Sequence, residues 1–255
     1  MRDRADTDTG TAASEVVAYV IIVAIVFVVF GLIFFNVTSI FASAGDSERV
    51  ANAERGLEIL QSNAERVVFG GTPRRTTEFP IGGGSVSVGG EKVRVNVTVV
   101  PDSGDAVVRN RTLSPVRYEL NDNVLLYENG GVISATGNRN GSVMASDPGW
   151  VIRDDAVTVQ TVRTFGVGSV SGQTATVETE SAGDAFTEAI PKGESGNVTV
   201  EVVDSGNSQA WALYMESLSS RPTVVDVPGD TKIKMEIDNS QRFVYVEKPV
   251  RVEVR

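Results

Sequence analysis

The strongest constraint on this fold lies near the N-terminus, where residues 16–35 read VVAYVIIVAIVFVVFGLIFF, twenty positions without a charge. A helix of that length rises about 30 Å, which matches the hydrocarbon core of a bilayer. Strands seldom exceed about ten residues, so the length of the segment favours a helix. We therefore expect a membrane-spanning helix, with residues 1–14 in the cytoplasm and the chain after residue 40 outside it.

Three fates of this segment stay open. A cleaved secretory signal has an apolar stretch of about 7–15 residues, shorter than this one, although Ala42, Ser43 and Ala44 fit its cleavage site. An uncleaved anchor requires only the apolar residues. In a type IV pilin-like precursor, a short polar leader is removed and the apolar helix remains as anchor and assembly element. Cleavage after Gly10 or after Ala12 fits this pattern, so the processing candidates are Gly10, Thr11, Ala12 and Ala13.

Two stretches of the chain carry a resemblance to a known group of proteins. Residues 14–35 and 46–79, the latter reading DSERVANAERGLEILQSNAERVVFGGTPRRTTEF, resemble haloarchaeal pilin-like surface proteins with a class III signal segment and a second helix of the NAER type. Residues 206–218, with Trp211 and Tyr214, resemble the aromatic helix of these proteins. The resemblance implies a cell-surface, pilin-like architecture and a prepilin-type peptidase as partner, and it supplies no activity.

Glu15 is the candidate assembly residue. Cleavage after Gly10 would make it the fifth residue of the mature chain. A carboxylate at the rim of an apolar helix is costly unless it is paired, and in type IV pilins the equivalent group meets the freed α-amino group of a neighbouring subunit. The alternative is a solvated residue at the headgroup boundary.

Composition excludes several kinds of chemistry. The chain has no Cys and no His, which removes thiolate and imidazole catalysis and the usual zinc ligands. Its formal net charge of −10 argues against a nucleic-acid partner, because phosphate-binding surfaces are cationic. Only five of the 23 basic residues are Lys, and an acidic, Lys-poor surface is typical of a halophilic source. We expect no cofactor, no metal site and no enzymatic activity, with a two-carboxylate glycoside hydrolase as the enzymatic alternative.

Residues 46–69 predict a helical stretch, because acidic residues stand in its first turn and two glycines follow its end. Apolar residues recur there at spacings of three and four and form one stripe, made of Val50, Ala53, Leu57, Leu60, Ala64 and Val67. We expect this stripe to pack on the protein's own β-structure. A filament or coiled-coil contact is the alternative.

From residue 79 onward the apolar period changes to two. Residues 92–100, KVRVNVTVV, alternate valines with polar residues, as a strand with one solvated face does. The same pattern predicts strands at residues 156–162, 174–180, 197–203, 231–237, 242–247 and 250–254. Residues 208–219 break the pattern and predict a short helix with Ser208 as N-cap.

The predicted fold class is α+β: a long N-terminal hydrophobic and amphipathic helix, forming a pilin-like stalk, followed by an antiparallel β-sandwich-like domain with one short helix. The expected domains are a leader over residues 1–10 or 1–12, a transmembrane and stalk helix over 11–71, and an extracytoplasmic β-domain over 79–255. Five Asn-X-Ser/Thr sequons fit an exported glycoprotein, and the glycosylation candidates are Asn96, Asn110, Asn140 and Asn197.

The functional expectation is a pilin-like structural subunit of an archaeal cell-surface filament, or a filament-associated surface protein, that acts in assembly or adhesion. It would lie in the cell membrane and at the cell surface. Its partners would be the membrane, the prepilin-type peptidase and other copies of the chain bound through the N-terminal helix. The alternative is a monomeric, single-pass membrane-anchored binding domain outside the cytoplasm.

Overall fold

The computed structural model describes residues 9–136, 141–153, 156–190, 195–218, 223–226, 232–240 and 242–255. The side chains of residues 9–22, 29–44, 223–226 and 238–240 lie outside this description. The chain divides into two compact units, Met1–Glu48 and Arg49–Arg255, and the strands that the structure describes all belong to the second.

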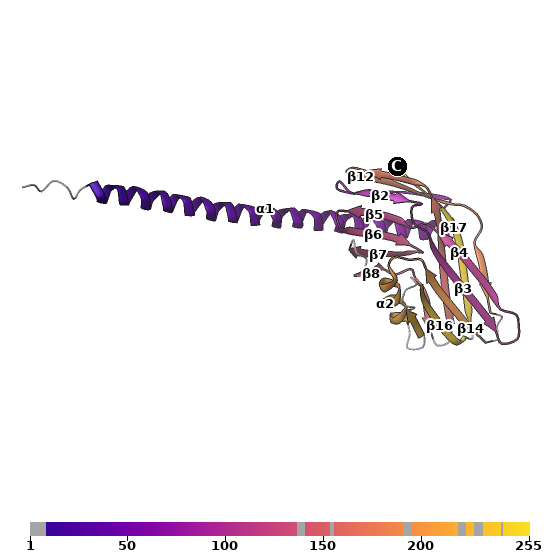
Figure 1. Cartoon of the computed structure of the whole chain (residues 1–255). Coiled ribbons are helices and arrows are strands. Elements are labelled where there is room, and N and C mark those ends of the chain that lie inside the picture. Colours follow the sequence, from indigo (N-terminus) through magenta and orange to yellow (C-terminus); the bar gives the residue numbers. More distant parts are fainter. Residues whose placement is uncertain are drawn as a thin grey trace, which may run out of the picture. The chain divides into compact units, whose positions relative to one another are not determined.

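The described elements follow in chain order (Figure 1). They are α1 (Thr9–Val68), β1 (Arg74–Pro80), β2 (Ser85–Val88), β3 (Val93–Pro101), β4 (Val107–Leu113), β5 (Val116–Leu120), β6 (Asn123–Glu128), β7 (Gly131–Thr136), β8 (Val143–Ser146), β9 (Val151–Arg153), β10 (Ala156–Gly166), β11 (Gly168–Ser171), β12 (Thr174–Ser181), β13 (Phe186–Ala189), β14 (Gly196–Val203), α2 (Ser208–Leu218), β15 (Thr223–Asp226), β16 (Lys232–Ser240) and β17 (Phe243–Val254).

The membrane prediction concerns residues 16–35, which lie within the bounds of α1. Within the part of the chain that the structure describes, no helix is both long enough and apolar enough to cross a membrane. Of the predicted segment, only residues 23–28 have described side chains. The other side chains of the segment lie outside the described residues.

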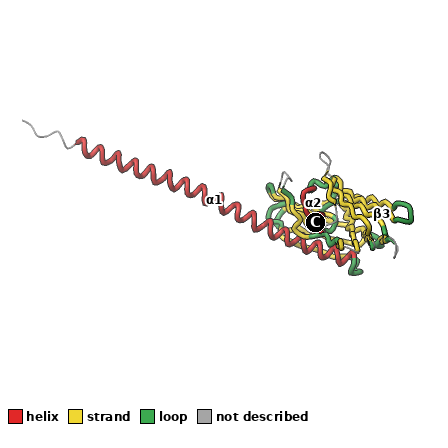
Figure 2. Tube along the Cα trace, turned by 90° about the horizontal axis from the view of Figure 1, so that it is seen from below, coloured by secondary structure: helices red, strands yellow, loops and turns green. Residues whose placement is uncertain are grey.

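The predicted fold class is wrong, because the chain is mostly β-structure (Figure 2) and the strands that the structure describes form three sheets instead of the two facing sheets of a sandwich. The first sheet has the order β1-β12-β17-β10-β9, with β13 also paired to β17; the second has the order β11-β2-β5-β6-β7-β8; the third has the order β15-β16-β14-β3-β4. The first sheet is not wholly antiparallel, since β10 and β17 run parallel. A parallel pair needs a long crossover connection, which local alternation of apolar residues does not reveal.

Two apolar cores hold the three sheets together. The first core joins the third sheet to α2, to β6 and β7 and to the N-terminal parts of β10 and β17, and it contains Trp150 and Trp211. The second core packs the apolar stripe of α1 on β1, β2, β5 and β12 and on the C-terminal part of β17, with Leu57 and Leu60 fully buried. The prediction that this stripe packs on the protein's own β-structure is confirmed.

Strand β6 explains why two facing sheets do not suffice. Its residues Val124 and Leu126 belong to the first core, whereas Leu125 and Tyr127 belong to the second. A strand that is buried on both faces reads as a continuous apolar run, without the alternation of a half-solvated strand. The second sheet is therefore covered on both sides at β6, which gives this region one more layer than a sandwich has.

Strand β17 changes its buried face near its middle. Phe243 and Tyr245 belong to the first core, and Val250 and Val252 belong to the second, so the buried positions shift from odd to even numbers. The alternation therefore resembles two strands, predicted at residues 242–247 and 250–254, where the structure has one. At the change of face, Lys248 Nζ donates to the carbonyl oxygens of residues 67 and 68 (2.8 and 2.9 Å), the last two residues of α1.

Candidate functional site

The predicted processing and assembly residues fall within the bounds of α1. These residues are Gly10, Thr11, Ala12, Ala13 and Glu15, and their side chains lie outside the described residues. Residues 1–8 of the predicted leader also lie outside them. Leader cleavage and the pairing of Glu15 with an α-amino group stay predictions.

Three of the four glycosylation candidates lie on one sheet. Asn96 lies on β3, Asn110 on β4 and Asn197 on β14, which are adjacent strands of the third sheet, whereas Asn140 lies outside the described residues. Asn110 and Asn197 are exposed and Asn96 is half-buried. The sequence placed these sequons far apart, and only the strand order brings them together.

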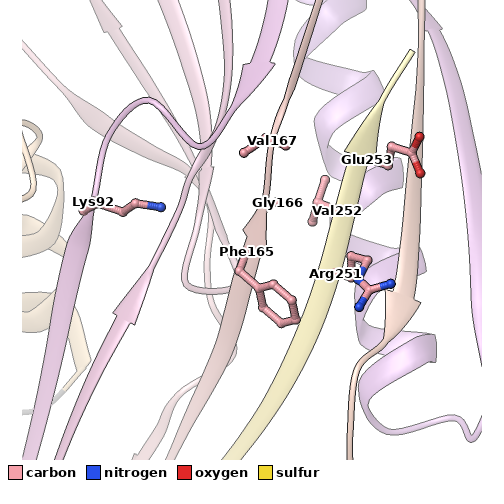
Figure 3. Close-up of a pocket in the computed structure, with 7 residues that line it drawn as sticks. All are labelled: Lys92, Phe165, Gly166, Val167, Arg251, Val252 and Glu253. Carbon is pink, nitrogen blue, oxygen red and sulfur yellow. The ribbon is translucent and has the colours of Figure 1, made fainter.

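An open pocket of about 550 Å³ lies between β10, β17 and the residue that precedes β3 (Figure 3). Gly166 permits the close approach of β10 and β17, because a Cβ atom at this position would lie 1.9 Å from the carbonyl oxygen of Val252. Val167, between β10 and β11, is 81% exposed at the pocket. The pocket is lined by Lys92, Phe165, Gly166, Val167, Arg251, Val252 and Glu253.

The charged groups of this pocket do not converge on one point. Lys92 points toward the strand that carries Phe165, and its ammonium donates to Ser114 Oγ (2.6 Å). Arg251 and Glu253 lie on the other side of β17 (Figure 3). Glu253 is the single carboxylate among the described lining residues, whereas glycoside hydrolysis uses two. On the side of β17 that carries Val252, the pocket therefore offers an apolar wall with the Lys92 ammonium beside it.

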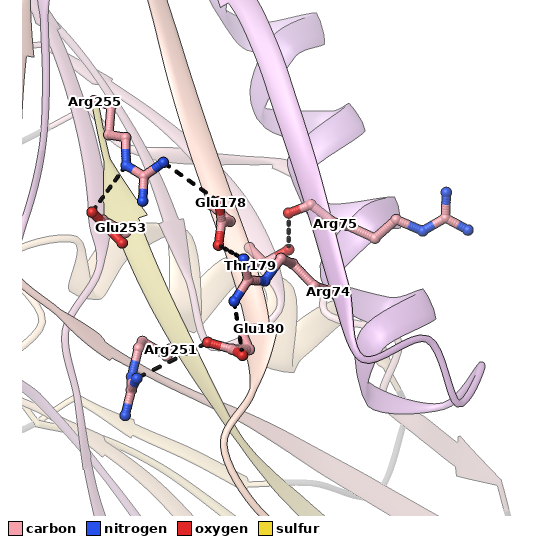
Figure 4. A network of polar contacts seen from close by, with 8 residues as sticks. All are labelled: Arg74, Arg75, Glu178, Thr179, Glu180, Arg251, Glu253 and Arg255. Carbon is pink, nitrogen blue, oxygen red and sulfur yellow. Dashed lines mark hydrogen bonds and ion pairs between the residues drawn. The ribbon is translucent and has the colours of Figure 1, made fainter.

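A ladder of ion pairs, here called the charged ladder, crosses the first sheet next to the pocket (Figure 4). Arg74 on β1 contacts Glu178 (3.0 Å) and Glu180 (3.1 Å) on β12. The same two carboxylates contact Arg255 (3.8 Å) and Arg251 (4.0 Å) at the C-terminal end of the chain. The hydrogen bond to Glu180 and the charge of Glu178 raise the pKa of Arg74 above its ordinary value. Opposite charges on adjacent strands favour one pairing register, so we assign the ladder to the alignment of β1, β12 and β17.

A second ionic cluster, the Glu247 clamp, joins the first sheet to the third. Glu247 on β17 is only 4% exposed, and it accepts a hydrogen bond from Arg111 on β4. Arg163 on β10 lies 3.2 Å from the other oxygen of the same carboxylate. A buried carboxylate is stable only when its charge is compensated, and here two guanidinium groups compensate it. The clamp holds the edge strand β4 against β10 and β17.

Aromatic and charged groups continue this contact between the sheets. Arg109 of β4 contacts Glu188 of β13 (3.0 Å), and its guanidinium lies 4.7 Å from the ring centroid of Phe186. Beside them, burial raises the pKa of Tyr245 to about 12. Arg109, Glu188 and Phe186 are partnered within the fold, so we assign them to sheet packing.

The described part of the chain is a mostly β protein with three sheets and an N-terminal helix, whose ion pairs join neighbouring strands and sheets. The chain belongs to DUF7289, a family of unknown function, whose family model matches residues 12–255. No curated protein and no solved structure matches the chain. The resemblance to pilin-like surface proteins stays a prediction.

The pocket and the clamp were both missed by sequence reasoning, although each left a signal. Gly166 and Gly168 flank one residue inside a strand pattern, which marks a close approach of another backbone. Glu247 follows Phe243 and Tyr245 at a period of two, so a carboxylate stands at a core-facing position and requires a buried partner. The identity of that partner, Arg111, depends on the strand order and had no sequence signal.

Proposed function

We propose that this protein is a surface protein that is anchored and assembled through its N-terminal helix, as a pilin-like filament subunit or a filament-associated protein. The observation that carries the proposal is the exposure of four consecutive apolar residues of α1. Ile25 is 56% exposed, Val26 45%, Phe27 73% and Val28 62%. Successive residues of a helix are about 100° apart, so these four side chains point around most of its circumference.

Such side chains need an apolar environment outside their own chain. Leaving a large apolar side chain in water costs about 1.5–3 kcal/mol relative to burying it. Lipid and the apolar helices of other copies are the two environments that meet this need, and helices in lipid associate by side-chain packing. The uncharged run of residues 16–35 supports both.

The C-terminal part of α1 is packed into the β unit. Leu57 and Leu60 are fully buried in the second core. The side-chain amide of Gln61 donates to the carbonyl oxygens of Gly130 (2.8 Å) and Asp147 (2.7 Å). The helix that carries the exposed apolar residues is therefore also a core element of the β unit, in contrast to a dispensable tether.

A pair of variants tests the anchoring part of the proposal. Phe27→Lys places a charge in the exposed apolar run, and Ile59→Lys places the same charge at a residue of α1 that is 53% exposed outside that run. We expect Phe27→Lys to lower recovery of the full chain in membranes and in sheared surface material, whereas Ile59→Lys leaves recovery unchanged. Equal recovery of both variants in membranes would contradict the proposal.

The N-terminus of the recovered protein tests the filament part. Intact mass and N-terminal sequencing of sheared surface material should give a mature start at Thr11 or Ala13. Glu15→Gln should then reduce filament yield while the chain stays in the membrane. A Met1 start found in membranes alone would refute filament assembly.

The pocket favours a second candidate function, a monomeric membrane-anchored binding domain. Its apolar wall at Phe165 and Val252, with Lys92 beside it, suits a ligand that combines an apolar body with an anionic group. In this case, chemical cross-linking in native membranes would give monomers, and Lys92→Ala would impair function without changing localisation. Cross-linked multimers that contain only this chain would favour the filament.

A further inference from the structure

The outer face of the third sheet collects three sequon asparagines. The valines of β3 and β14 at positions 95, 97, 198, 200 and 202 are buried in the first core, so the alternate residues of these strands point to the opposite face. Asn96 and Asn197 occupy that opposite face. Asn110 of β4 stands directly across from Asn96 in the pairing register, which places it on the same face.

The two neighbouring asparagines differ in their surroundings. The side-chain amide of Asn96 donates to Glu201 Oε2 (3.2 Å) on the adjacent strand β14. Burial raises the pKa of Glu201, but hydrogen bonds from Lys232 and Asn96 outweigh it and hold this pKa below its ordinary value. Asn96 Nδ2, the atom to which a glycan would be attached, therefore already donates a hydrogen bond to an ionised carboxylate. In addition, its strand β3 is paired on both sides, with β14 and β4. Asn110 is exposed, on the last strand of the third sheet in the described order.

Two exposed apolar side chains lie to one side of Asn110 on the same face of the sheet. Val108, two residues earlier on the same face of β4, is 50% exposed. Val108 pairs with Thr98, and Val100, two residues beyond Thr98 on β3, is 44% exposed. Same-face neighbours along a strand are about 7 Å apart, so Val108 lies one such step from Asn110 and Val100 about two steps along the neighbouring strand. A few sugar residues at Asn110 would reach both valines. Edge strands with exposed apolar residues are sites of unwanted strand addition unless they are covered.

We infer that Asn110 carries an N-linked glycan that covers Val100 and Val108 at the edge of the third sheet. This inference rests on the proposed function, because the chain must leave the cytoplasm to meet the glycosylation machinery. The co-reactant is a lipid-linked oligosaccharide phosphate. The bond between its anomeric carbon and the phosphate oxygen breaks, a carbon–nitrogen bond to Asn110 Nδ2 forms, the amide loses one proton, and the lipid phosphate leaves with the electron pair.

Substitutions in the sequon provide the test with matched controls. The full chain is recovered from native membranes, and its peptides are mapped by mass spectrometry. We expect the Asn110 peptide to carry a glycan and the Asn96 peptide to be unmodified. Asn110→Gln and Thr112→Ala should each lose the mass of one glycan, whereas Thr112→Ser keeps the sequon and the mass. An unmodified Asn110 peptide, or a glycan on Asn96 in its place, would overturn the inference.

The covering role has its own readout. We expect Asn110→Gln and Thr112→Ala to bind more of a fluorescent apolar dye and to self-associate at lower concentration than Thr112→Ser, by several-fold in each case. Loss of the glycan without these changes would refute the covering role. The location of the chain separates the two proposals: a membrane-bound chain with unmodified Asn110 overturns only the glycan, whereas a chain found only in the cytoplasm overturns both.

Discussion

Removing the two cations of the Glu247 clamp should destabilise the protein more than removing all three of its charged groups. The side chain of Glu247 is 5% exposed, whereas those of Arg111 and Arg163 are 31% and 38% exposed. The double variant Arg111→Met/Arg163→Met therefore leaves a carboxylate that water does not reach, at an expected cost of about 3–5 kcal/mol. Arg111→Met alone should cost about 1.5–3 kcal/mol, because Arg163 still compensates the carboxylate.

The triple variant, with Glu247→Met added, separates the charge from the packing. Apolar replacement of a complete buried ionic cluster is often neutral or stabilising, so we expect it to recover most of the loss and to lie within about 2 kcal/mol of the parent. The triple variant should thus be more stable than the double variant that it contains. If each lost contact simply subtracted from the stability, the triple variant would instead be the less stable of the two.

Urea unfolding of the full chain in detergent micelles measures these differences. Trp150 and Trp211 are buried in the first core with ring centroids 5.5 Å apart, so tryptophan fluorescence reports the packing of that core. The slope of the unfolding free energy against urea concentration should be the same for all variants. In that case, differences between their transition midpoints report differences in stability. A double variant that loses less than about 1 kcal/mol, or a triple variant no more stable than the double, would refute the reasoning.

Three further predictions concern packing and ionisation. Leu60→Ala should cost about 2–5 kcal/mol of unfolding free energy and Ile59→Ala less than about 0.5 kcal/mol, because the first side chain is fully buried and the second is 53% exposed. Gly166→Ala should lower the melting temperature, since its Cβ would meet the backbone of β17, whereas Gly45→Ala, with open space around it in α1, should raise it slightly. Burial raises the pKa of Tyr245 from 10.0 to about 12, so its stabilising contribution is complete below pH 10 and is lost as the pH rises toward 12. Spectroscopic titration of tyrosinate should show this late ionisation, and Tyr245→Phe should remove one tyrosine from it, whereas Tyr127 and Tyr214, whose pKa values burial also raises, still ionise late.

Alternating strands with one buried face could be predicted from the sequence. The pattern at residues 92–100, 174–180 and 197–203 gave strands that the structure confirms as β3, β12 and β14. The short helix predicted at residues 208–219 is confirmed as α2, where Trp211 is fully buried. In these segments the local period and the burial have the same cause, because one side faces the core and the other faces water.

The strands that were missed have other causes. The apolar run of β6 is buried on both faces, and short strands such as β9 and β13 have too few residues to show a period. Pairing across long sequence separation, such as β10 with β17 or β4 with β3, depends on the assembled topology and not on local pattern. For the same reason the sequons could be found from the sequence, but not their gathering on one face.

Strand β6 also sets how the β unit can change over evolution. Its successive residues are buried alternately in the two cores. Leu125 and Leu126 therefore pack against different neighbours, although they are adjacent in the chain. A shift of one residue in β6 would exchange the contributions to both cores at once. The leucine pair tolerates that exchange, but Tyr127, fully buried in the second core, would have to be accommodated in the first. We therefore expect single insertions or deletions in β6 to disrupt both cores. Sequence change in β6 must instead proceed by substitutions, each of which alters the packing of one core.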